Sequence, residues 1–187
     1  MTDNQFLIKA TDRQRLLAFH RSFDRLMTDC AADNYRQTVI LCIGCDRSTG
    51  DALGPLVGSR LTHLAKYGVQ VMGTLAKPVH ALNLRETLAA IDLLDDPFVI
   101  AVDASLGRLD YVGSVVLRKG GLLPGAGVGK QLPEVGHVSI SAIVNVGGFL
   151  EQQVLQSTSL YQVTQLAQLI SQGLGYYFSA NQARAII

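Results

Sequence analysis

Apolar and polar residues follow one another along this chain in blocks that are typical of buried strands and amphipathic helices. Some apolar residues recur every three or four positions, which predicts helices with one buried face. Others form continuous runs, which predict strands covered on both faces of a sheet. The predicted helices cover residues 12–29, 53–64, 82–94 and 160–178, and the predicted strands cover 39–43, 69–72, 98–102, 112–118 and 138–146.

The order of these elements predicts the fold class. Strands that alternate with helices favour a three-layer α/β/α fold with a mostly parallel central sheet. The segment 112–118 alternates between apolar and polar residues, so we expect it to be an edge or antiparallel strand. Residues 119–137 are rich in Gly and Pro and predict a long loop. The length of 187 residues suits a single domain over 1–187.

Composition narrows the class of partner. Charged residues make up 17% of the chain, below the roughly 25% of ordinary domains, and the mean hydropathy is +0.24, which excludes a disordered chain. A net charge of +1 predicts no nucleic-acid partner. No apolar run reaches membrane-spanning length, and the N-terminus lacks the pattern of a secretion signal. We therefore expect a cytoplasmic protein with no membrane partner, and the apolar composition suggests a homodimer through the first or last helix.

Two aspartates follow the two most apolar strands. In parallel α/β sheets, sites form beyond the carboxyl ends of strands, so Asp51 and Asp103 are expected to face one crevice. Two close carboxylates can share a proton. The ionised one then takes a proton from water while the other protonates the leaving group. Two alternatives stay open, namely a divalent metal held by the pair and a role of Asp51 as a helix cap.

Further residues are expected to line the same crevice. Asp46 and Arg47 would form its rim, with Arg47 able to bind a substrate carboxylate or carbonyl. His80 lies between a predicted strand and a predicted helix and would reach the crevice, and His137 is a weaker candidate as ligand or acid/base. The glycine-rich loop would offer backbone N–H groups to substrate or an oxyanion, from Gly125, Gly127 and Gly129.

Two motifs in the chain are incomplete. Cys42 and Cys45 form a C-x-x-C, but Cys42 falls inside a predicted strand and no second cysteine pair exists for zinc. We interpret both as structural thiols. The string Gly125-Ala-Gly-Val-Gly-Lys130 lacks the first Gly and the final Ser or Thr of a Walker A motif, so nucleotide binding is not expected.

Three longer strings resemble a known family. They are Ile43-Gly-Cys-Asp-Arg-Ser-Thr-Gly-Asp-Ala-Leu-Gly-Pro55, the pieces Gly73-Thr-Leu and Pro78-Val-His-Ala-Leu-Asn83, and Val144-Asn-Val-Gly-Gly-Phe149. Together they resemble the sporulation protein YyaC family of spore-forming Firmicutes, over about residues 15–175. That family is in turn similar to the spore germination protease and, more distantly, to the hydrogenase maturation proteases. The resemblance implies a hydrolase-like α/β fold of the hydrogenase-maturation-protease type.

The resemblance also implies an activity. Gly50-Asp-Ala-Leu-Gly-Pro55, Val102-Asp-Ala-Ser-Leu106 and Pro124-Gly-Ala-Gly-Val-Gly129 match germination-protease strings in which two aspartates are catalytic, so that role would fall on Asp51 and Asp103. In the hydrogenase proteases a third-loop histidine joins such residues at a metal, but Lys130 stands nearest that place here. The implied function is an endopeptidase of sporulation or germination, with small acid-soluble spore proteins as expected substrates. The alternative is a sporulation-associated peptide- or ligand-binding protein without enzymatic activity.

Overall fold

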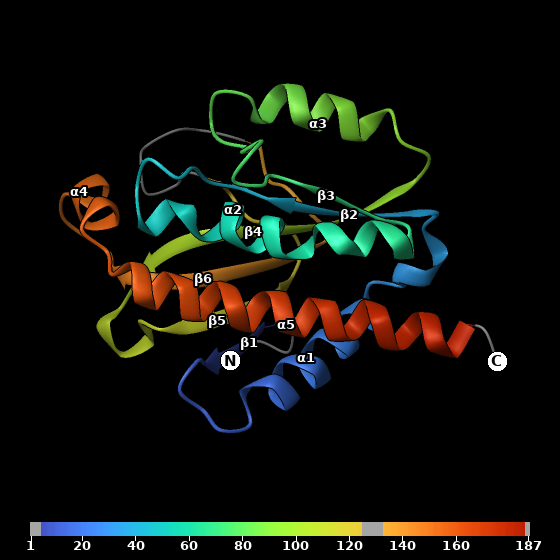
Figure 1. Cartoon of the computed structure of the whole chain (residues 1–187), viewed down its shortest axis with the longest axis horizontal. Helices are drawn as coiled ribbons and strands as arrows, with labels where there is room; N and C mark the ends of the chain where they lie inside the picture. Colours follow the sequence, from blue (N-terminus) through green and yellow to red (C-terminus); the bar gives the residue numbers. More distant parts are fainter. Residues whose placement is uncertain (1–4, 125–132, 186–187) are drawn as a thin grey trace.

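The computed structural model describes residues 5–124 and 133–185 and has a six-stranded sheet at its centre (Figure 1). The strand order is β1-β5-β6-β4-β2-β3. The strands are β1 (Gln5–Lys9), β2 (Gln37–Cys42), β3 (Val69–Met72), β4 (Pro97–Gly107), β5 (Ser114–Lys119) and β6 (Val138–Val146). The helices are α1 (Arg15–Asp29), α2 (Leu53–Leu61), α3 (Leu84–Asp92), α4 (Glu151–Gln156) and α5 (Leu160–Ala185), with short 3-10 helices η1 (Ala32–Asn34), η2 (Gly50–Ala52), η3 (Thr62–Tyr67) and η4 (Leu109–Tyr111).

The sheet is mostly parallel, as the sequence predicts. Strands β3, β2, β4 and β6 run parallel, while β5 is antiparallel to both β1 and β6. The apolar run of β2 is fully buried because both of its neighbours are strands and both of its faces are covered. Thus the three-layer α/β/α expectation is confirmed.

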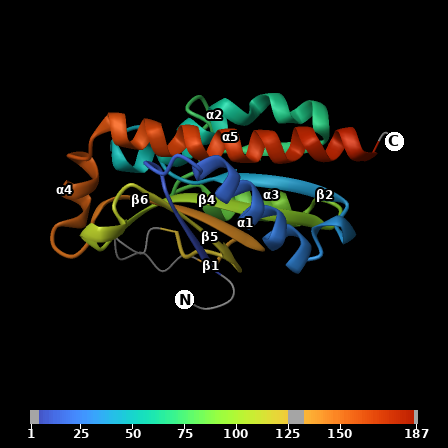
Figure 2. The ribbon, with the colours of Figure 1, turned by 90° about the horizontal axis from the view of Figure 1, so that it is seen from below.

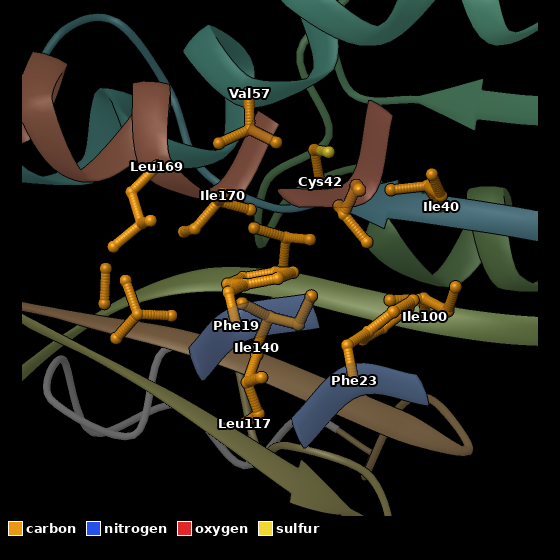
Figure 3. Close-up of a cluster of buried hydrophobic side chains, with 14 of the residues drawn as sticks. Phe19, Phe23, Ile40, Cys42, Val57, Ile100, Leu117, Ile140, Leu169 and Ile170 are labelled. Carbon is orange, nitrogen blue, oxygen red and sulfur yellow. The ribbon is translucent and has the colours of Figure 1, made fainter. Parts of the chain in front are cut away.

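One face of the sheet carries the larger core. Side chains from α1, α2 and α5 pack there against alternate residues of β2, β4, β5 and β6. Phe19 and Phe23 of α1 point at this face, opposite Leu169 and Ile170 of α5 (Figure 3). In the view from below, α2 and α5 lie together over one side of the strands (Figure 2). This layer holds the sheet along its whole width.

The opposite face is covered only in part. Leu84 and Ile91 of α3 form a second core with the outward residues of β2 and β4. In Figure 1, α3 lies above β3 and β2 and away from β1 and β5. We call β2, β3 and β4 the covered half of the sheet. We call β1, β5 and β6 the open half, because no described helix packs on their α3-side face.

Glycines allow α2 to approach the covered half closely. A Cβ atom at Gly58 would lie 2.1 Å from the backbone oxygen of Gly73, and one at Gly73 would lie 1.7 Å from that of Cys42. Gly73 also has a φ of +87°, a conformation that side chains disfavour. Any larger residue would therefore push α2 and the end of β3 away from β2.

Several boundaries differ from the sequence-based expectation. Strand β1 and helix α4 were not expected, since each is short and only part of its surface is buried. The helix expected at 53–64 ends at Leu61 and continues as η3, and the last helix extends to Ala185. A hydrogen-bonded bridge joins Leu122 to Val135, so part of the expected loop is ordered backbone pairing. Within residues 5–124 and 133–185, no helix combines the length and apolar character needed to cross a membrane.

Candidate active site

Three chain segments meet at the carboxyl end of β2. After Cys42, Ile43 pairs with Val79 in a parallel bridge, and the Gly44 N–H donates to the Val79 oxygen at 2.7 Å. Gly44 has a φ of +137°, and a Cβ there would lie 2.0 Å from the backbone oxygen of Asp51. Glycine is required at position 44 because the turn folds back onto η2. The close packing brings the segments around Val79 and Asp51 to the same edge of the sheet.

Asp51 is held by the turn that precedes it. Its Oδ2 accepts the Cys45 N–H at 2.8 Å, and the residue is half-buried. Neither η2 nor α2 has a side-chain cap hydrogen bond, so the interpretation of Asp51 as a helix cap is wrong. The carboxylate points back toward residues 44–47, where it accepts a hydrogen bond from the Cys45 N–H, a backbone donor that has no partner in the sheet.

Asp103 lies inside β4, whereas the sequence suggested a loop after the strand. The strand runs to Gly107 because β6 continues to pair with it, from Asp103 opposite Ser141 onward. The last pair between β2 and β4 is Cys42 with Val102, so Asp103 is the first β4 residue beyond the end of β2. Alternation along the strand puts Asp103 on the same face as Ala101, which belongs to the α3-side core.

The electrostatics of the two aspartates are linked. Loss of solvent, followed by the negative charge of Asp51, raises the pKa of Asp103 well above its usual range. The Ala104 N–H, which Asp103 Oδ1 accepts at 2.8 Å, lowers that pKa by a smaller amount. Asp103 therefore keeps its proton at pH values where an ordinary carboxyl group is ionised. The expectation that Asp51 and Asp103 act together at one site stays a prediction.

The two cysteines of the C-x-x-C motif have different surroundings. Cys42 is fully buried, and burial raises its pKa far above the usual range. Burial also raises the pKa of Cys45, and the neighbouring Asp51 carboxylate raises it further. Neither thiol is placed to ionise readily, unlike the reactive cysteine of a redox motif. The sequence did not predict Cys45 as a partner of Asp51, because the donor is the backbone N–H, which every residue except proline has.

Two polar atoms in the segments that meet at the carboxyl end of β2 have no partner within the described residues. They are Nδ1 of His80 and Oγ of Ser48, both buried. His80 directly follows Val79, and its backbone N–H donates to Asn83 Oδ1 at 2.8 Å. A buried polar atom of this kind is stabilised when water or a ligand supplies the missing hydrogen bond. Asp46 and Arg47 are exposed in the turn before Ser48, and their role at a substrate-binding rim stays a prediction.

Helix α4 packs beside the turn that carries Asp51. A Cβ at Gly50 would lie 2.7 Å from the Leu155 Cδ2 atom, so α4 and η2 are in close contact. Asn145 holds this helix in place, since its amide donates to Thr158 Oγ1 at 3.2 Å and to the Val154 oxygen at 3.4 Å. The string around Asn145 that carries the family resemblance thus has a structural part, since it positions α4 against the turn that carries Asp51.

Two further expectations concern the glycine-rich loop and His137. Gly125, Gly127 and Gly129 lie outside the described residues. His137 lies at the other end of β4, where its Nδ1 accepts the Val99 N–H at 3.0 Å and its ring stacks on Phe98. The interpretation of His137 as a site residue is therefore wrong. His137 directly precedes β6, which runs parallel to β4, so it lies near the amino end of β4 and not near Asp103.

The alternative in which Asp51 and Asp103 hold a divalent metal stays a prediction. Among residues 5–124 and 133–185, no three His, Cys, Asp or Glu side chains are grouped so that they could hold a metal ion. Asp51 and Asp103 alone supply two carboxylates. We therefore derive no chemical step through a metal.

Comparison with known proteins places the chain in a family. Residues 9–173 match the family described as "Protein of unknown function (DUF1256)". A curated relative, "Uncharacterized protein YyaC" of Bacillus subtilis (strain 168), is 53% identical over 137 residues, which cover 73% of this chain and 67% of the relative. The chain belongs to the DUF1256 family. This membership confirms the sequence resemblance to YyaC.

One solved structure is similar to this DUF1256 protein in shape. It is the [NiFe] hydrogenase maturation protease HycI from Thermococcus kodakarensis KOD1, with a TM-score of 0.49 and 20% sequence identity. The match covers 82% of this chain and 98% of that chain.

Proposed function

We propose that this DUF1256 protein is an endopeptidase in which Asp51 and Asp103 activate water for hydrolysis of a peptide bond. The observation that carries the proposal is the unequal environment of the two carboxyl groups. Asp51 accepts a backbone hydrogen bond, whereas desolvation and the charge of Asp51 keep the proton on Asp103. A carboxylate beside a carboxylic acid is the arrangement that general base and general acid catalysis require.

The first step forms the tetrahedral intermediate. Asp51 takes a proton from water as the water oxygen attacks the carbonyl carbon of the substrate. The π electrons of the carbonyl move to its oxygen, to which protonated Asp103 donates a hydrogen bond. Asp51 is oriented for this step by the Cys45 N–H.

The second step breaks the peptide bond. Asp103 gives its proton to the leaving nitrogen, the C–N bond breaks, and the carbonyl re-forms. The products are a carboxylic acid and an amine, with one water consumed. A proton shift from Asp51 to Asp103 through water restores the starting state. We assign the binding of the substrate backbone to His80 Nδ1 and Ser48 Oγ, because both are buried polar atoms without a partner among the described residues.

The biological setting follows from the resemblance to YyaC and the spore germination protease. We propose a role in sporulation or germination, in the cytoplasm of the sporulating cell or in the spore. Small acid-soluble spore proteins are the first substrates to test. A homodimer through the first or last helix remains part of this proposal.

The test is a cleavage assay read by mass spectrometry. Wild-type protein, Asp51→Asn and Asp103→Asn are incubated with small acid-soluble spore proteins and with a random peptide library, each with and without chelator. Each substitution is expected to lower kcat by at least about a hundredfold, with no effect of the chelator. Asp33→Asn is the matched control. Asp33 is exposed in η1, which precedes the amino end of β2, whereas the proposed site lies at the carboxyl end.

Other outcomes favour other functions. Cleavage by both aspartate variants at the wild-type rate would contradict the dyad. Cleavage that stops with chelator would indicate metal-assisted hydrolysis instead. Intact substrate in every reaction, together with peptide binding, would favour the non-enzymatic binding protein.

A further inference from the structure

A hollow of about 280 Å³ opens on the α3-side face of the open half of the sheet. Its floor consists of side chains from β1, β5 and β6, and its wall comes from the segment after β5. The lining residues are Gln5, Val116, Arg118, Leu122, Leu123, Ser139 and Ser141. Leu123 is 61% exposed there, so the hollow offers apolar surface as well as hydroxyl groups.

The hollow begins beside Asp103. Ser141 is the β6 partner of Asp103, and Val116 is the β5 partner of Ser141. Strand alternation directs Ser141 to the same face as Asp103, since Ile140 and Ala142 on either side belong to the opposite core. Neighbouring strands lie about 4.8 Å apart. The floor of the hollow is thus a direct continuation of the row that contains the proposed acid.

A guanidinium group marks the far end. Arg118 lies two residues beyond Val116 on β5 and pairs with Gln5 of β1. It is exposed, and its Nη2 donates to the Gly121 oxygen, which holds the side chain at the hollow. A guanidinium has five N–H donors, so others are available to a ligand. Among the described residues, no carboxylate lies within ion-pair distance of Arg118, including Glu134 near Gly121.

We propose that this hollow is a substrate subsite in which Arg118 binds a peptide carboxylate. The proposal rests on the proposed peptidase function and names its substrate class. Arg118 lies two strands away from Asp103, across β6 to β5, and two residues along β5, which is a distance of roughly 12 Å. An extended peptide spans that distance in three to four residues. The carboxylate therefore belongs to an acidic side chain, or to the chain terminus, three to four residues from the bond that is cleaved.

The test measures binding and cleavage separately. Fluorescein-labelled octapeptides carry a single Glu that is moved one position at a time, each with a Gln counterpart and an amidated C-terminus. A further set has no Glu and ends in a free carboxylate. Anisotropy on Asp103→Asn protein gives Kd without turnover, and mass spectrometry with wild-type protein gives the cleavage position.

We expect Glu peptides to bind at least about tenfold tighter than their Gln counterparts at one position. Arg118→Gln should remove this preference, and Arg118→Glu should transfer it to peptides that carry Lys. Lys119→Gln is the matched control, because its side chain lies on the other face and donates to the Asp29 oxygen. If only the free-carboxylate set shows the preference, the bound group is the chain terminus.

The outcomes separate the two proposals. Carboxylate-dependent binding without cleavage retains the subsite and overturns the peptidase. Cleavage that ignores Glu, Gln and Arg118→Gln retains the peptidase and overturns the subsite. An equal loss in Arg118→Gln and Lys119→Gln, or no carboxylate preference at any position, also overturns the subsite.

Discussion

The covered and open halves of the sheet use the same strand geometry for different purposes. In the covered half, α2 and α3 bury both faces of β2 and β4, and nearly every outward residue is apolar. In the open half, one face of β1, β5 and β6 packs on α1 and α5, while the other carries serines, Gln5 and Arg118. Asp103 lies on the boundary. A rigid, two-sided support thus holds the proposed acid, and a one-sided sheet beside it leaves room for a substrate.

The largest expected effect tests how closely the covered half is packed. Gly73→Ala places a Cβ 1.7 Å from the Cys42 oxygen, at a φ of +87°. We expect it to lower the free energy of unfolding by more than about 4 kcal/mol. Gly113→Ala is the control in the open half, with a φ of +82° and nothing within 4 Å of the new Cβ. Only backbone strain of about 1–2 kcal/mol should remain there. Urea denaturation measures both variants, and an equal loss of unfolding free energy in the two would contradict the expected difference in packing.

A second pair compares valines on the same face of the sheet. Val39 is fully buried beneath α3, whereas Val116 is half-buried at the hollow. Val39→Ala should cost about 2 kcal/mol through lost burial and the resulting cavity. Val116→Ala should cost less than about 1 kcal/mol. Urea denaturation measures both, and a Val116 cost as large as that of Val39 would mean that the open half is covered in solution.

Asp103, at the boundary of the two halves, is expected to lower the stability of the folded protein at high pH while it supplies the proton for catalysis. Its pKa is raised in the folded state, so its contribution to stability is complete below the unfolded pKa and is lost as pH rises through the folded pKa. Asp103→Asn cannot ionise and should melt at a higher temperature than wild type at pH 8, with a smaller difference at pH 4. Catalysis by the wild type should decline over the same rise in pH, because the acid loses its proton. A variant that is less stable at pH 8 would argue against a desolvated carboxyl group.

The smallest expected effect lies at the other end of β4. Burial lowers the pKa of His137, whose neutral Nδ1 accepts the Val99 N–H. A lowered histidine pKa contributes stability above the unfolded pKa of about 6.5, and that stability is lost as pH falls toward the folded pKa. Unfolding measured from pH 7 to pH 5 should show this decrease in the wild type and less of it in His137→Phe. His63→Gln, at an exposed position of η3, should behave like the wild type.

Local sequence patterns were sufficient for most of the architecture. The runs in β2 and β4 predict buried parallel strands because only a two-sided environment accommodates unbroken apolar sequence. The turn after β2 was also predictable, since its glycines and Asp51 follow directly from a strand end. Strand β1 was missed because it is an edge strand whose only strand neighbour within the described residues, β5, lies about a hundred residues away in sequence. Helix α4 was missed because its six residues carry little periodic signal.

The sequence by itself determined the order of the strands and helices other than β1 and α4, the two aspartates as candidates and the family of the protein, because each of these depends on residues that are close in the chain. Tertiary structure alone decided that Asp103 lies within β4, that Asp51 binds the Cys45 N–H, and that His137 stands at the opposite end of the sheet. It also decided that Ser141 and Val116 continue the row from Asp103 and that Arg118 lies two residues along β5 from that row. These facts depend on strand register, which is set by packing between segments that are distant in the chain.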